Sequence, residues 1–220
     1  MAESRRLRTR QRIRRLLLLL SFILLPVTLY YFSPALVLGA ASEGIVNGSL
    51  ITFALMLLGA VFLGRLWCGW ACPAGGLQDC ATLVHDRTAP GGRWNWTKWV
   101  VWVPWAGLIV VLAAGAGGLR SVDPFYGLEG GVTLAIAADP QGPPWYLIYY
   151  VVVALFLGIA LAIGQRAACH YVCWMAPFMI IGCKVGNALR VPALRLSVRP
   201  DRCTGCGACT RHCPMGLEVK

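Results

Sequence analysis

The chain has 220 residues, of which 58% are hydrophobic and 13% charged, with a mean hydropathy of +0.65 and a net charge of +11. This composition excludes an intrinsically disordered protein, and its length and apolarity are untypical of a small disulfide scaffold. A soluble basic nucleic-acid-binding protein would carry more charge among fewer apolar residues, so no nucleic-acid partner is expected. The remaining class is an integral membrane protein with ten cysteines.

Four apolar segments are predicted to cross a membrane as helices, because about 20 apolar residues span about 30 Å of hydrocarbon. They cover residues 16–38, 49–66, 99–118 and 145–164. A basic arm at 1–15 precedes the first segment, and this pair could alternatively be a signal peptide. The apolar run is too long for that, and no convincing cleavage site precedes the second segment. We therefore expect an all-α polytopic membrane domain over residues 16–198 and a small module at 199–220.

The positions of Lys and Arg predict how these segments are oriented. All of them lie in the basic arm, after the second segment or after the fourth, except Arg120, which lies between the third and fourth. Basic loops stay on the cytoplasmic side, so both termini are predicted to be cytoplasmic in a bacterial inner membrane. The basic arm also favours contact with anionic membrane lipid. Tryptophans at the start of the third segment fit an aromatic belt or, alternatively, a quinone-stacking surface: Trp94, Trp96, Trp99, Trp102 and Trp105.

All ten cysteines fall on the predicted cytoplasmic side, where reducing conditions disfavour disulfides and clustered thiols are usually metal ligands or redox groups. The strongest motif reads C-x2-C-x2-C-x3-C-P, the run of bacterial ferredoxins. It consists of Cys203, Cys206, Cys209, Cys213 and Pro214. Gly205 and Gly207 let the backbone turn closely around sulfur. These four cysteines are the predicted metal and cofactor ligands of a [4Fe–4S] cluster, and zinc, which prefers cysteine pairs with a longer spacer, is the alternative.

The fourth ligand of this cluster is left open by the sequence. In two-cluster ferredoxins the last cysteine of such a run binds the other cluster, so Cys213 would serve a second cluster formed with a second run. Since the sequence stops at Lys220, we favour a C-terminally truncated chain, with the second cluster expected if it continues. The alternatives are that another cysteine completes the site, or that Cys213 bends back into a single cluster.

An internal repeat organises the membrane domain into two units of two segments each. The pattern R-x2-C-x3-C occurs twice at an offset of 101, as Arg65, Cys68 and Cys72, and again as Arg166, Cys169 and Cys173. Each copy precedes a third cysteine, Cys80 or Cys183, and a short apolar stretch, 76–84 or 175–185, that fits an interfacial or re-entrant helix. The paired cysteines are predicted redox or ligand pairs, with simple packing as the alternative. The two arginines either snorkel as anchors or balance thiolate charge.

These motifs together resemble the membrane polyferredoxins, which include the NapH-type 4Fe–4S proteins, the nitrous-oxide-reduction regulators and the cytochrome-oxidase assembly polyferredoxins. The resemblance rests on RLWCGWACPAGGLQD at 65–79, CHYVCWMAPFMIIG at 169–182 and the C-terminal run. It implies four spans, two C-x3-C-P motifs facing the cytoplasm and a ferredoxin module with two [4Fe–4S] clusters. This chain differs in two respects, since Trp174 follows Cys173 in place of proline and one ferredoxin run is present instead of two.

The predicted function is membrane-bound iron–sulfur electron transfer between the quinol pool or a cytosolic donor and a reductase system. Its expected partners are electron-transfer or reductase subunits, and quinone is a candidate second cofactor. If the protein acts as an enzyme, it would be a component of a quinol dehydrogenase. One alternative is a copper-handling or copper-reducing assembly factor for a respiratory metalloenzyme, since thiolates bind soft metals. The other is a membrane redox-sensing regulator.

Overall fold

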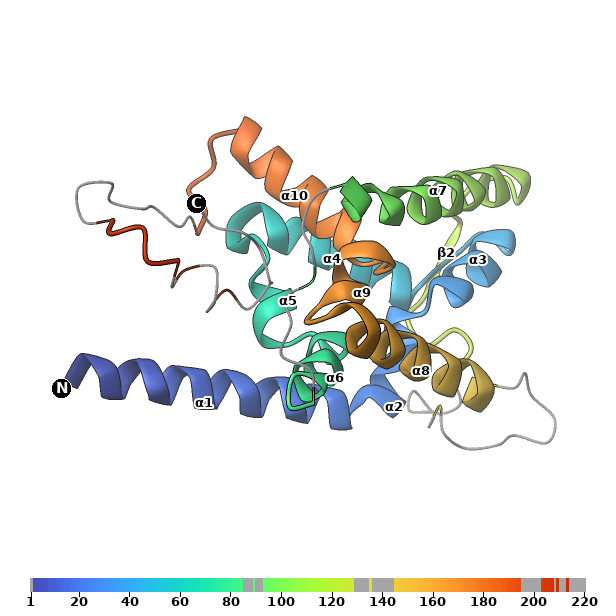
Figure 1. Cartoon of the computed structure of the whole chain (residues 1–220). Coiled ribbons are helices and arrows are strands. Elements are labelled where there is room, and N and C mark those ends of the chain that lie inside the picture. The colour runs from blue at the N-terminus through green and yellow to red at the C-terminus, as the bar shows by residue number, and fades with distance from the viewer. Residues whose placement is uncertain are drawn as a thin grey trace.

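The computed structural model describes residues 2–84, 89, 93–128, 135, 145–194, 203–207, 209 and 213. The described chain is mostly helical (Figure 1). One small parallel sheet pairs β1 (Ile45–Asn47) with β2 (Ser121–Asp123). In Figure 1 the start of α1 (Ala2–Ile23) and the C-terminal residues 203–207 lie toward one end of the molecule, and the β1–β2 pair lies toward the other.

The predicted first membrane segment, 16–38, is not one continuous helix. After α1 come α2 (Leu25–Thr28), the 3-10 helix η1 (Leu29–Phe32) and α3 (Pro34–Ser42). Pro26 lies in the first turn of α2 and Pro34 begins α3. Proline has no N–H to donate to the preceding turn, so each marks the start of a new helix. The helices before and after residue 24 are bent by 58° relative to each other.

Two described helices are long and apolar enough to cross a membrane, and they lie where the third and fourth segments were predicted. They are α7 (Thr97–Gly115), preceded by η2 (Arg93–Trp96), and α8 (Trp145–Ile163). The bent pair Thr9–Ile23 and Leu25–Phe32 would be a third span if it is counted as one. At the second predicted segment lies α4 (Gly48–Leu63), which is apolar but has 16 residues and so reaches only about 24 Å.

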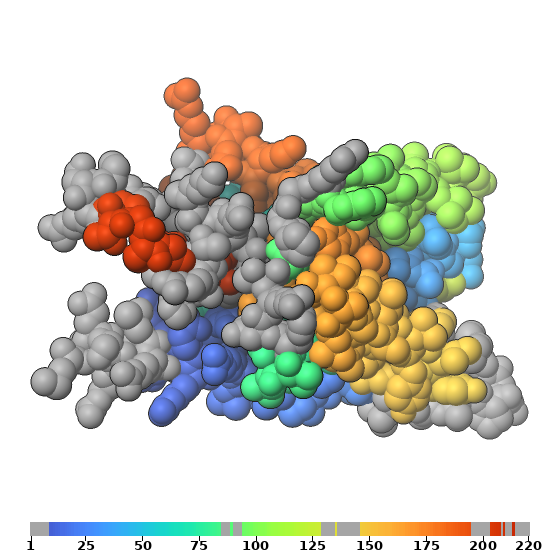
Figure 2. Space-filling view, in the orientation of Figure 1, coloured from blue at the N-terminus to red at the C-terminus, as the bar shows by residue number. Residues whose placement is uncertain are grey.

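The outward faces of α7 and α8 are apolar, as expected for helices surrounded by lipid. Figure 2 shows both helices on one face of the molecule, α7 in green and α8 in yellow to gold. The most exposed of their large apolar side chains are Val103, Val110, Val111, Val151 and Leu147. In the most apolar 18-residue stretch of each helix, only 6% of the residues of α7 and 11% of those of α8 are buried inside the protein. A soluble protein rarely exposes such continuous apolar surface, so this pattern is compatible with membrane association.

The internal repeat is visible in the backbone as well as in the sequence. The short helix α5 (Leu66–Trp70) recurs 101 positions later as α9 (Ala167–Tyr171). Both helices end in the equivalent hydrogen bond. The backbone amide of Cys72 donates to the Trp67 carbonyl at 3.0 Å, and that of Cys173 donates to the Ala168 carbonyl at 2.9 Å. The two C-x3-C turns therefore have the same local structure.

The two repeats exchange their short helices. After the first turn comes α6 (Pro73–Ala81), which packs against α8 of the second repeat and against α1. After the second turn comes α10 (Ala176–Ala188), which packs along α4 of the first repeat. Gly182 and Gly186 allow this close approach, because a Cβ at either position would lie 2.4 Å from a carbonyl oxygen of α4. The exchange brings the two C-x3-C turns together at the centre of the molecule.

Candidate functional site

The C-terminal ferredoxin run is described in part, and its backbone is shaped as the sequence predicts. Gly205 and Gly207 both adopt left-handed conformations, with φ of 68° and 65°, which glycine accepts without steric cost. Cys203, Cys206 and Cys209 are exposed and Cys213 is half-buried. Four thiols along a tightly turning loop are the donor type that an iron–sulfur cluster requires, so the residues fit the cofactor. The neighbouring Arg202 and Arg211, expected to add positive charge, lie outside the described residues.

The thiols are not gathered around a preformed ion site. Within the described part of the chain, no three side chains of His, Cys, Asp or Glu come together closely enough to hold a metal ion. None of the ten cysteines, all of which lie among the described residues, forms a disulfide.

The four cysteines of the two C-x3-C turns converge on one core. Cys72 and Cys173, which are equivalent in the repeat, are both buried in the same apolar cluster, at 3% and 4% exposure. Cys68 and Cys183 pack against that cluster. Cys169 is an electrostatic neighbour of Cys68 and Cys173, and the side-chain amide of Gln78 donates to its Sγ at 3.0 Å. The paired cysteines predicted from the sequence thus belong to one buried site with contributions from both repeats.

Burial and neighbouring thiols raise the pKa values of these cysteines. Burial, together with a smaller effect of the neighbouring Cys169, raises the pKa of Cys68 from 9.0 to about 11. Burial also raises the pKa of Cys72 and that of Cys173, again with contributions from the other thiols. The pKa of Cys169 is raised mainly by burial, against the opposing effect of Arg166. In each case burial is the largest cause of the raised pKa, because a buried thiolate loses its solvation by water.

Gln78 joins the two turns directly. It is fully buried on α6, next to the first turn. Its side-chain oxygen accepts a hydrogen bond from the backbone amide of Ala168 at 3.1 Å, while its nitrogen donates to Cys169 and to the Ala74 carbonyl. One side chain from the first repeat therefore fixes the position of the second C-x3-C turn.

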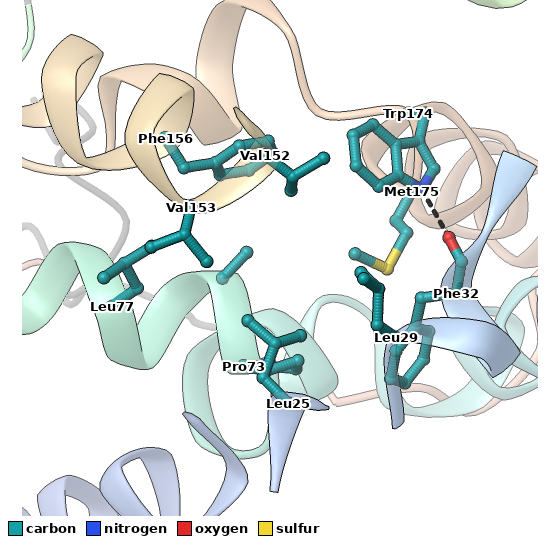
Figure 3. Close-up of a pocket in the computed structure, with 11 residues that line it drawn as sticks. Leu25, Leu29, Phe32, Pro73, Leu77, Val152, Val153, Phe156, Trp174 and Met175 are labelled. Atoms are coloured by element: carbon teal, nitrogen blue, oxygen red, sulfur yellow. Dashed lines mark hydrogen bonds between the residues drawn. The ribbon is translucent and has the colours of Figure 1, made fainter. Parts of the chain in front are cut away.

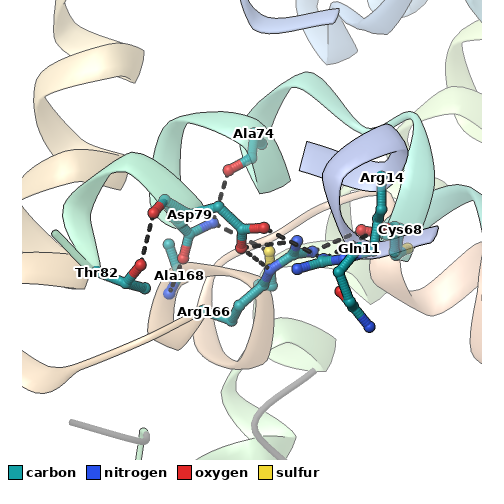
Figure 4. A network of polar contacts seen from close by, with 11 residues as sticks. Gln11, Arg14, Cys68, Ala74, Asp79, Thr82, Arg166 and Ala168 are labelled. Atoms are coloured by element: carbon teal, nitrogen blue, oxygen red, sulfur yellow. Dashed lines mark hydrogen bonds and ion pairs between the residues drawn. The ribbon is translucent and has the colours of Figure 1, made fainter. Parts of the chain in front are cut away.

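A buried ionic network surrounds the same turns (Figure 4). Arg166 has no exposed surface and donates from Nε to the Asp79 carboxylate at 3.0 Å and from Nη1 to the Cys68 carbonyl at 2.5 Å. Its Nη2 forms an ion pair with the same carboxylate at 2.9 Å without hydrogen-bond alignment. Arg14 of α1 lies 3.2 Å from the other carboxylate oxygen. Two arginines thus share one acidic partner, and the network has an excess positive charge.

The two repeats differ in structure at their equivalent arginines, Arg65 and Arg166. Arg166 is buried with a left-handed φ of 60°, whereas Arg65 is half-buried with an ordinary φ of −93°. The helices before them end at Leu63 and Ile163, and a glycine follows each, Gly64 or Gly164, so Gln165 is an extra residue in the second repeat. That insertion coincides with the turn of Arg166 into the protein. The snorkelling interpretation is therefore wrong for Arg166.

Sequence reasoning did not identify several polar residues of this site. Gln78 and Asp79 lie in the motif at 65–79, but nothing in their spacing indicates their partners. Lys98, at the start of α7, was assigned to a basic loop, yet it is 3% exposed and lies near Cys169 and Cys173. Arg14 was assigned to the basic arm and is 9% exposed. A charged residue within an apolar context is the one signal that could have drawn attention to them.

Two cavities adjoin the turns. The smaller, about 20 Å³, lies between α2, η1, α6 and α8 and has only apolar walls, so it is expected to stay dry (Figure 3). The indole N–H of Trp174 beside it is already bonded to the Phe32 carbonyl at 2.9 Å. The larger is a groove of about 380 Å³ along α4, next to Trp67 and Trp70. The indole N–H of Trp67 is buried and has no hydrogen-bond partner.

Comparison with known proteins identifies two 4Fe–4S binding domains in the chain. One matches residues 48–89, which contain α4, α5, α6 and the first C-x3-C pair. The other matches residues 196–217, which contain the C-terminal run. No solved structure matches the chain.

Three curated relatives are similar over most of this chain. The methylamine utilization ferredoxin-type protein MauN of Methylorubrum extorquens is 28% identical over 182 residues, covering 81% of this chain and 57% of the relative. MauN of Methylobacillus flagellatus is 24% identical, covering 70% of this chain and 50% of the relative. An uncharacterized protein of Methanocaldococcus jannaschii is 25% identical, covering 78% and 60%. The chain spans between half and three-fifths of the length of these relatives.

Proposed function

Because this chain is a polyferredoxin-like 4Fe–4S protein, we propose that it transfers electrons at a bacterial inner membrane, between the quinol pool or a cytosolic donor and a reductase system. The observation that carries this proposal is the C-terminal run, with its two left-handed glycines. When bound there, a [4Fe–4S] cluster accepts and returns one electron at a time. We assign Cys203, Cys206, Cys209 and Cys213 as its ligands.

The exposure of the run supports a role in exchange with a partner. Cys203, Cys206 and Cys209 lie at the surface rather than in the core. An electron-transfer partner can therefore approach this loop closely without rearrangement of the helices. The basic residues of the run, together with the basic arm, favour an acidic docking surface on that partner.

Quinol is the donor that the membrane domain supports best. The groove along α4 has the volume of a site for one small organic molecule and has mostly apolar walls. The unpartnered N–H of Trp67 can donate to an oxygen of a quinol ring. Trp67 immediately precedes Cys68, so a molecule in this groove lies next to the paired thiols. The topology of four spans with cytoplasmic termini is part of the same proposal.

The proposal is tested on protein purified anaerobically in detergent. We expect broad iron–sulfur absorbance that is bleached by dithionite and, more slowly, by duroquinol. The variant Trp67→Phe keeps an aromatic ring but lacks the indole N–H donor. We therefore expect bleaching by duroquinol to be about tenfold slower and bleaching by dithionite to be unchanged.

Each of the other outcomes contradicts a defined part of the proposal. Stoichiometric zinc without iron would exclude electron transfer by a cluster. If duroquinol bleaches the wild-type protein and the Trp67→Phe variant at the same rate, the groove is not the quinol site. Copper bound in proportion to the C-x3-C cysteines would favour metal handling, the second candidate, which the convergence of four thiols also supports.

A further inference from the structure

We propose that Cys68, Cys72, Cys169 and Cys173 together hold one [4Fe–4S] cluster, with each half of the repeat supplying two of its four thiolate ligands. This inference rests on the proposed function, because both assign iron–sulfur chemistry to the chain. It goes further by placing a second cluster in the membrane domain rather than in a continuation of the C-terminal module.

The first argument is the number of ligands. A [4Fe–4S] cluster takes four cysteine thiolates, one on each iron. The domain matched at 48–89 contains three cysteines, Cys68, Cys72 and Cys80. Cys80 lies near the far end of α6, about 12 Å along the helix from Cys72. The first repeat by itself therefore offers one close pair and cannot complete a cluster.

The second argument is where the fold places the missing pair. The exchange of α6 and α10 between the repeats brings Cys169 and Cys173 beside Cys68 and Cys72. Each thiol lies within electrostatic reach of at least one thiol of the other repeat. The two turns have the same backbone hydrogen bonds, so they present their cysteines in equivalent ways.

The third argument is charge. Arg166 is fully buried and, with Arg14, faces the single carboxylate of Asp79. Arg65 and the buried Lys98 also lie near these thiols. A buried excess of positive charge is costly unless an anion compensates it. A cluster held by four thiolates is anionic and would supply this compensation.

The fourth argument distinguishes a cluster from a single ion. The described cysteines are not gathered around a common point, as the ligands of one zinc or copper ion must be. In a cubane each thiolate binds a different iron, so its four ligands stand farther apart.

The test uses the full chain with the C-terminal run disabled by Cys203→Ser, Cys206→Ser and Cys209→Ser. We expect this triple variant, purified anaerobically, to retain about four iron and four sulfide per chain. Adding Cys169→Ser and Cys173→Ser should lower both at least tenfold. Adding Cys80→Ser instead is the matched control and should leave both unchanged.

Several results would overturn the inference. A triple variant without iron would confine iron to the C-terminal run, which contradicts the inference but leaves the proposed function intact. Wild-type protein without any dithionite-reducible absorbance would contradict both the inference and the proposed function. Iron that survives Cys169→Ser with Cys173→Ser but is lost with Cys183→Ser would show that the ligand set is wrong. Copper or zinc in place of iron would exclude a cluster.

A second measurement needs no substitution and so does not depend on the variants folding. Dithionite-reduced wild-type protein should give two distinguishable electron paramagnetic resonance signals, one from each cluster. Its iron content should be about eight per chain, four for each cluster. A single signal with about four iron per chain would contradict the inference.

Discussion

Arg166 is the side chain on which the central polar site depends most. It is the largest fully buried side chain of the described chain, and it reaches the Asp79 carboxylate and the Cys68 carbonyl from the second repeat. Gly75 makes room for it, because a Cβ there would lie 2.7 Å from Nη1 of Arg166. A guanidinium can form these contacts at once because its donors are fixed in one plane.

Replacing Arg166 should therefore destabilise the fold far more than replacing its counterpart in the repeat. We expect Arg166→Ala to lower the free energy of unfolding by about 3–5 kcal/mol, because it leaves Asp79 short of a partner in the interior. The matched control, Arg65→Ala, removes a half-buried arginine and should cost less than about 1 kcal/mol. Thermal unfolding in detergent measures both, and similar losses would contradict the central role of Arg166.

The residues of the site were predictable to different degrees. The spacing C-x3-C and its repetition identify the four paired cysteines, because that pattern is local to each turn. The partners of Gln78 and Asp79 in the second repeat are separated from them by 87 residues or more, as in the contact with Arg166. Such pairings depend on how the helices pack, and no local pattern encodes them.

Among the elements, α4 and α10 determine whether the two turns meet. Their interface depends on Gly182 and Gly186, four residues apart on one face of α10, where α4 comes into backbone contact. Small residues at this spacing permit close helix approach. The helix breaks at Pro26 and Pro34 likewise follow from the sequence. Their 58° bend required the structure, since proline marks a break without setting its angle.

Substituting a glycine at this interface should separate the two helices. In Gly186→Ala the new methyl group would lie 2.4 Å from the Val61 carbonyl oxygen, so we expect a loss of about 1–3 kcal/mol in unfolding free energy. The same change at Gly107 of α7 meets no atom within 4 Å and should stabilise the helix by about 0.5–1 kcal/mol. Opposite shifts of the unfolding midpoint are expected, and equal shifts would show that α10 is not tightly packed on α4.

For the whole molecule, the distribution of charge and the arrangement of the helices lead to one expected topology. The start of α1 and the C-terminal cysteines lie toward the same end, away from the β1–β2 pair (Figure 1). Arg120, the single basic residue between α7 and α8, lies next to β2. A membrane crossed by α7 and α8 would thus separate the basic regions from this sheet.

Reporter fusions test this topology in cells. Green fluorescent protein fused after Lys220 should fluoresce, because the C-terminus is expected in the cytoplasm. Alkaline phosphatase inserted after Gly44, beside β1, should be active because it needs an oxidising compartment. If alkaline phosphatase is inactive after Gly44 but active when it is fused after Lys220 instead, the orientation is the opposite of the one predicted.

The sequence by itself determined two long apolar helices, the iron–sulfur run and the internal repeat. Apolar length predicted the helices α7 and α8, cysteine spacing predicted the iron–sulfur run, and an offset of 101 predicted the repeat. All three are local properties of the chain. Only the tertiary structure decided that α6 and α10 are exchanged, that both C-x3-C turns contribute cysteines to one core, and that Arg166 is fully buried while Arg65 is not. These features depend on contacts between residues far apart in the chain, which packing selects and composition does not specify.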